Sequence, residues 1–124
     1  MIIKYTGNLN AYYLQTLAMI FFPGAKFPEN EPETPETIVI VIDLKEAETA
    51  AAAHAEIRRG DKITIGDAVQ LRDAAVGDDD RIRKIAVGHA FLIAGQTFTG
   101  FTPPWGIMTG VRPAKLVSEY LEHG

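Results

Sequence analysis

The chain has 124 residues, of which 47% are hydrophobic, and carries a formal net charge of −4. These values describe one globular domain that buries roughly two-thirds of its unfolded surface, and the acidity disfavours a nucleic-acid-binding protein. No apolar run reaches the about 18 residues that span a bilayer, and Met1 opens without a basic leader, so we expect a cytoplasmic protein with no membrane partner. The absence of cysteine excludes disulfides, thiol nucleophiles and cysteine-held zinc or iron–sulfur clusters within these residues.

The first third of the chain combines strand, helix and loop signals. Residues 1–6 are apolar and β-prone and predict a strand. Asn8 or Asn10 can cap the next element, an amphipathic helix over residues 10–22. Residues 24–36 contain three prolines and four glutamates and predict an exposed acidic loop. A carboxylate metal site is the alternative, but the Asp/Asn alternation and glycine turn of a calcium loop are missing.

The middle of the chain contains the strongest strand signal. Five consecutive β-branched apolar residues within residues 37–44 predict a central strand. Residues 46–58 are alanine-rich, which favours a helix by propensity. The turn signal at residues 58–62 and the alternating pattern at residues 62–67 favour a hairpin instead. These residues alone leave helix and strand open, and in a strand the small alanines would let a helix approach closely.

The next helix has a clear start signal. Residues 66–78 are expected to be irregular, and the aspartates at 78–80 place a carboxylate cap and negative charge at the start of a helix over about 80–97. The same aspartates could suggest a metal site, but the helix start accounts for them better. Thr99-Gly100 is expected to end the helix.

The buried face of this helix is predicted from its apolar spacing and comprises Ile82, Ile85, Ala86, His89 and Ile93. Gly88 and Gly95 are expected at close contacts with the sheet. His89 is interpreted as a core or interface histidine, since His54, His89 and His123 share no metal-ligand spacing. The sequence contains neither a serine-hydrolase motif nor a phosphate-binding glycine loop.

Residues 103–117 form the most constrained stretch, Pro-Pro-Trp-Gly-Ile-Met-Thr-Gly-Val-Arg-Pro-Ala-Lys-Leu-Val. Trp105, the only tryptophan of the chain, is expected to anchor a core or a domain interface. Pro113 is placed to begin a short C-terminal helix. Arg112 and Lys115 could hold an anion near that helix start, although basic residues at such positions are commonly solvated.

This stretch resembles the signature that ends the N-terminal domain of oxygen-independent coproporphyrinogen III oxidase-like proteins of the coproporphyrinogen dehydrogenase type. Met108 stands where the family usually has Leu, and Ala114 where it has Thr or Ser. The resemblance implies an accessory domain at residues 1–102 and a Trp-Gly segment at 103–124 that leads to a C-terminal radical SAM domain of the same parent chain. The interdomain or anchor residues would be Trp105, Gly106, Gly110, Arg112, Pro113 and Lys115.

The resembling family acts in porphyrin and haem biosynthesis. It couples cleavage of S-adenosylmethionine at a [4Fe–4S] cluster to oxidative decarboxylation of coproporphyrinogen III. The cluster motif C-x-x-x-C-x-x-C is absent here, so we expect a non-catalytic chain without a cofactor, within an oxidoreductase parent. The alternative is a stand-alone protein-interaction or small-ligand module. The expected C-terminal helix also offers a surface for homo-oligomer formation.

The family has a hairpin at the alanine-rich stretch, so we predict a strand over residues 48–58. The expected fold is α+β: a small, mainly antiparallel sheet of about four strands in the order β-α-β-β-β-α, with two helices on one face and a short C-terminal helix.

Overall fold

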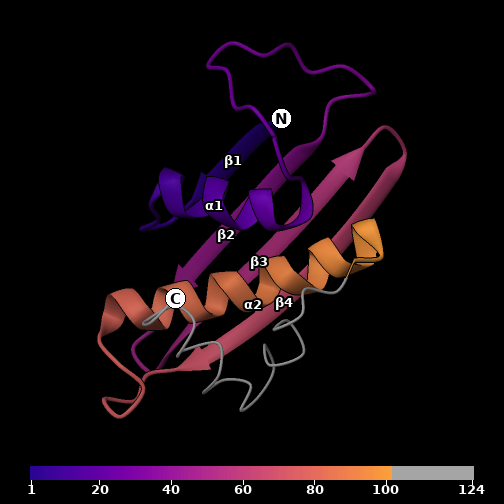
Figure 1. Cartoon of the computed structure of the whole chain (residues 1–124). Coiled ribbons are helices and arrows are strands. Elements are labelled where there is room, and N and C mark those ends of the chain that lie inside the picture. Colours follow the sequence, from indigo (N-terminus) through magenta and orange to yellow (C-terminus); the bar gives the residue numbers. More distant parts are fainter. Residues whose placement is uncertain (102–124) are drawn as a thin grey trace.

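The computed structural model describes residues 1–101 (Figure 1). Its elements are, in order, β1 (Ile2–Thr6), α1 (Ala11–Phe21), β2 (Val39–Glu46), β3 (Ala50–Arg59), β4 (Lys62–Leu71) and α2 (Asp79–Thr99). This is the predicted α+β order, and both helices lie on the same side of the sheet. The expected C-terminal helix and the Trp-Gly segment lie outside the described residues. Neither described helix is long and apolar enough to cross a membrane.

The four strands form one mixed sheet in the order β1-β2-β3-β4. β1 pairs with β2 in parallel, and α1 makes the crossover between them. The other two pairs are antiparallel, so the sheet is mainly antiparallel, as predicted. Gly60, with φ of 60°, lies in the two-residue turn between β3 and β4, where a positive φ favours glycine.

The alanine-rich stretch is a strand, as predicted, although its helix propensity is high. Ala51, Ala53 and Ala55 alternate toward the helices and are at most 3% exposed. The helix α2 contacts β3 along this row of small side chains. Burial and the hydrogen bonds between strands therefore outweigh the intrinsic preference of alanine for helix.

The bounds of three strands differ from the sequence prediction, and β3 spans Ala50–Arg59 rather than residues 48–58. The strand expected over residues 37–44 begins at Val39 and extends to Glu46. The prediction of irregular structure over residues 66–78 is wrong for its first part, because β4 continues to Leu71. Ala50, at the start of β3, is the register partner of Leu71, so the length of β3 supplies partners that the local sequence does not reveal.

Both helices begin and end where the local signals indicate. The side chain of Asn10 accepts hydrogen bonds from the backbone N–H groups of Tyr12 and Tyr13. The side chain of Asp78 accepts one from the N–H of Arg81 at 2.9 Å. Gly100, with φ of 74°, ends α2 in the left-handed conformation.

The helix α2 approaches the sheet most closely at Gly66. A Cβ atom added there would lie 2.1 Å from the carbonyl oxygen of Ala90, so only glycine fits. The prediction that Gly88 and Gly95 contact the sheet is wrong: a Cβ at these positions would meet Tyr13 and Phe21 of α1. Small residues on two sides of α2 therefore allow two close approaches, one to β4 and one to α1.

Candidate docking surface

The face of the sheet opposite the helices is not covered by any helix of the described chain (Figure 1). Ile40, Ile42 and Leu44 of β2 point to the helices and are at most 5% exposed. Because successive side chains alternate across a strand, their neighbours in β2 point to the opposite face. The same alternation runs through β3 and β4. We call this surface the open face.

A row of polar side chains crosses the centre of the open face. Thr6, Asp43, His54 and Asp67 are consecutive register partners across all four strands. The hydroxyl of Thr6 donates to Asp43 Oδ1 at 2.5 Å, and His54 Nδ1 lies 2.6 Å from Asp67 Oδ1. In this geometry an N–H at Nδ1 can donate to the carboxylate. The row therefore offers hydrogen-bonding groups and negative charge to a partner.

Four large apolar side chains flank this row on β4. Ile63 and Ile65 are 54% and 50% exposed, and Val69 and Leu71 are each 65% exposed. We call these four residues the apolar stripe. Single exposed apolar residues are ordinary, but four on one strand, two on each side of Asp67, indicate a surface that another element covers. The stripe was visible in the sequence only as alternation, which does not say whether its face is covered.

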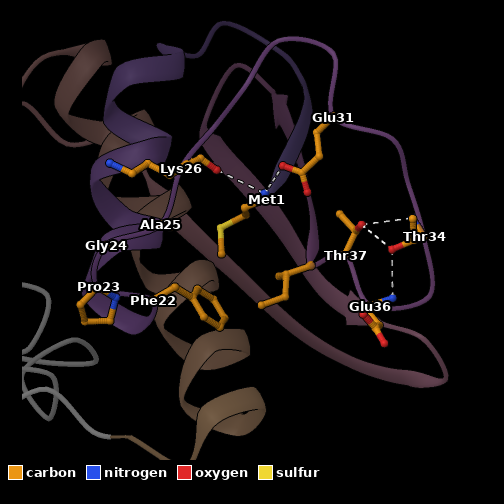
Figure 2. Close-up of a pocket in the computed structure, with 11 residues that line it drawn as sticks. Met1, Phe22, Pro23, Gly24, Ala25, Lys26, Glu31, Thr34, Glu36 and Thr37 are labelled. Carbon is orange, nitrogen blue, oxygen red and sulfur yellow. Dashed lines mark hydrogen bonds and ion pairs between the residues drawn. The ribbon is translucent and has the colours of Figure 1, made fainter.

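A cleft of about 380 Å³ lies between the end of α1 and the proline-rich, acidic loop at residues 24–36 (Figure 2). Its polar groups mostly pair with one another. The terminal amine of Met1 contacts the Glu31 carboxylate and donates to the carbonyl of Lys26 at 3.2 Å, and the hydroxyls of Thr34 and Thr37 lie 2.9 Å apart. These contacts hold the loop against the start of β1. We therefore favour the open face over this cleft as the functional surface.

Several acidic residues outside the open face form ion pairs with nearby cations in the described part of the chain. Residues 1–101 contain no group of three or more His, Asp or Glu side chains that could hold a metal. The loop predicted at 24–36 is irregular, as expected, and Glu33 pairs with Lys4 at 3.2 Å. Asp79 and Asp80 lie in the first turn of α2 and pair with Arg72 and Lys84.

The pKa values of two other titratable groups are shifted by their local surroundings. His89 is half-buried on α2, and this burial lowers the pKa of its imidazole. Glu46 accepts hydrogen bonds from Arg72 and Arg83, which lower the pKa of its carboxyl. This arginine pair joins the ends of β2 and β4 to the start of α2.

The residues predicted to anchor an interdomain contact lie outside the described part of the chain. They are Trp105, Gly106, Gly110, Arg112, Pro113 and Lys115, and their roles remain predictions. The surface that sequence reasoning missed is the open face, because its recognition requires the positions of both helices.

The chain is similar to the "Oxygen-independent coproporphyrinogen-III oxidase-like protein HemZ" of Bacillus subtilis (strain 168). The two are 25% identical over 118 residues, which cover 90% of this chain and 22% of the relative. The chain thus spans less than a quarter of the length of this curated relative. No protein-family profile matches the chain, and no solved structure matches it.

Proposed function

We propose that this chain is the non-catalytic N-terminal accessory domain of a radical SAM oxygen-independent coproporphyrinogen III oxidase-like enzyme. The observation that carries the proposal is the alignment with the Bacillus subtilis protein, which covers 90% of this chain but 22% of the relative. The signature-like run at residues 103–117 also supports it. The role of the domain is to dock on the catalytic part of the parent.

The open face supplies the surface for that docking. It combines the apolar stripe with the polar row through His54 and Asp67. An apolar region beside charged and hydrogen-bonding groups is the composition of a domain interface rather than of an enclosed catalytic pocket. The chemistry is therefore assigned to the remainder of the parent.

The donor set of this chain does not fit the family's [4Fe–4S] cluster. The chain has no cysteine, and residues 1–101 contain no alternative group of three metal-binding side chains. Cluster ligation by thiolates therefore belongs to a separate domain, as does S-adenosylmethionine, and no reaction step is assigned to residues of this chain.

The second candidate is a stand-alone protein-interaction module. The exposed apolar stripe favours it equally, since the same surface could bind a separate protein. The two functions differ in whether the partner is covalently continuous with this chain.

The test starts with the coding sequence downstream of codon 124. We expect the same frame to continue into a Cys-x-x-x-Cys-x-x-Cys motif. The parent, purified without oxygen and supplied with iron and sulfide, should then acquire iron–sulfur absorbance and, given S-adenosylmethionine and a one-electron reductant, oxidise coproporphyrinogen III. The isolated 124-residue chain, treated identically, is the matched control and should acquire no cluster. A frame that stops without the motif, or a parent that loads the cluster but leaves this substrate unchanged, would refute the proposal.

A further inference from the structure

Strand β4 is an edge of the described sheet, and its hydrogen-bonding groups alternate between β3 and the free edge. Lys62 pairs with Arg59 across the two-residue turn, and at the other end the N–H of Arg72 donates to the carbonyl of Thr49 at 2.8 Å. Both contacts assign the even-numbered residues to the bonds with β3. The odd-numbered residues from 63 to 71 therefore direct their N–H and C=O groups to the free edge.

The same odd-numbered residues present their side chains on the open face. They comprise the apolar stripe with Asp67 at its centre, and the Asp67 side chain is 70% exposed. The Leu71 carbonyl accepts from Gln70 Nε2 at 3.1 Å, but an incoming strand would find outward backbone groups and apolar side chains on the same residues in the described part of the chain. Opposite Asp67, a basic side chain would be favourable and an acidic one unfavourable.

The other edge of the sheet, formed by β1, is protected, unlike the edge formed by β4. β1 has five residues, and the proline-rich loop contacts it through the Glu33–Lys4 pair and the Glu31–Met1 pair. β4 has ten residues, contains no proline and has only Lys62 and Asp67 as charged residues. Long edges with so few charges are sites of strand addition or aggregation unless they are covered.

A second copy of the chain fits this edge poorly. The helix α2 lies over β3 and β4, and on β4 Thr64 Oγ1 donates to the carbonyl of Ala94 at 2.9 Å and Lys62 Nζ donates to that of Phe98 at 2.6 Å. Neighbouring strands are spaced by about 4.8 Å. Two copies joined through β4 would bring their α2 helices side by side, so a second copy must fit helix against helix as well as strand against strand. The edge suits an isolated extended segment instead.

We propose that the edge of β4 accepts an extended segment of the parent polypeptide from beyond residue 124, which adds a fifth strand to the sheet. The segment carries apolar residues along the apolar stripe and Lys or Arg opposite Asp67. This inference rests on the proposed function, and two observations identify the occupant. The chain spans 22% of its relative, so most of a comparable parent would lie outside it. The end of α2 also contacts the first residue of β4 through Phe98 and Lys62, and Phe101 packs edge-on against Phe21 of α1, so the chain leaves the described domain from the end of α2 that contacts β4.

Amide hydrogen exchange of the parent and of the isolated 124-residue chain tests this assignment. The even-numbered amides of β4 should be protected in both proteins, because they bond β3. The amides of Ile65, Asp67 and Val69 should exchange about tenfold or more slowly in the parent than in the isolated chain. This alternating change distinguishes strand addition from burial of the open face without backbone pairing.

Val69→Pro removes one outward N–H while sparing the bonds to β3, which is the arrangement in which edge strands tolerate proline. In the parent it should return the exchange of Ile65 and Asp67 to the rate in the isolated chain. Val69→Ala, which keeps the N–H, is the matched control and should retain at least half of the protected fraction. If the proline variant does not fold, Asp67→Lys supplies the test. This exposed substitution would place a lysine opposite the basic residue of the added strand, so the amides of Ile65 and Val69 should lose their protection in the parent.

Each other outcome overturns the assignment. Equal exchange of these amides in parent and isolated chain excludes strand addition, while a cysteine-bearing parent would leave the proposed function standing. Protection in the isolated chain that rises with concentration would identify a second copy as the occupant. Protection there that is independent of concentration would show that the chain covers its own edge. A chain without a longer parent removes both this inference and the proposed function.

Discussion

Gly66→Ala is the sharpest test of how α2 packs on the sheet. The added Cβ would lie 2.1 Å from the carbonyl oxygen of Ala90 and 2.8 Å from the backbone nitrogen of Ala94. These are helix backbone atoms, which cannot rotate away, so the whole of α2 must shift. Overpacking of this kind costs about 1–3 kcal/mol, of which about 0.4–1 kcal/mol is offset because alanine restricts the unfolded chain. We expect a net loss of about 1.3 kcal/mol in the free energy of unfolding.

Urea unfolding followed by circular dichroism measures this loss. With a slope of about 1.5 kcal/mol/M, the midpoint of Gly66→Ala should fall by about 0.9 M. Gly88→Ala is the matched control, because its Cβ would meet only the hydroxyl of Tyr13 at 3.1 Å. That variant lies inside a helix and should keep or raise the midpoint, by up to about 1 kcal/mol in stability. An unchanged midpoint for Gly66→Ala would refute the close approach of α2 to β4.

Three further variants test local features. Asn10→Ala should lower the unfolding free energy by about 1 kcal/mol through loss of the α1 cap, whereas Asn10→Asp should preserve it; equal thermal midpoints for both would contradict the capping role. The lowered pKa of Glu46 stabilises the folded protein fully above the ordinary glutamate pKa of about 4.3, and this stabilisation is lost as the pH falls through the folded value. The free energy of unfolding of the wild type should exceed that of Glu46→Gln by under about 1 kcal/mol at pH 6, since these ion pairs are exposed. Urea titrations should show this difference shrinking toward about pH 3. A difference that stays constant would argue against the arginine contacts. The lowered pKa of His89 favours neutral imidazole, so stability is complete above about pH 6.5 and falls as the pH decreases. The temperature midpoint of unfolding should fall less for His89→Gln than for the wild type when the pH decreases from about 7.5 to 5.5. An equal fall in both proteins would exclude His89 as its source.

The features that the sequence predicted correctly act over short distances. Asn10 and Asp78 cap helices through backbone groups within three residues, and Gly60 forms a turn between adjacent strands. Such interactions depend on neighbours in the chain, so residue type and spacing are enough to identify them. The acidic loop was predictable for the same reason, since its prolines disfavour regular structure whatever lies beside it.

Only the tertiary structure decided which surfaces are covered. Ala51, Ala53 and Ala55 form a strand because α2 packs on them, and β4 reaches Leu71 because β3 is long enough to pair with it. The closest contact of α2 with the sheet involves Gly66 rather than Gly88 or Gly95, which local sequence could not distinguish. Alternation alone places the apolar stripe on one face, but its exposure depends on where both helices lie. Burial is a property of elements distant in sequence, and this is why the open face of the sheet emerged from the fold and not from its residues alone.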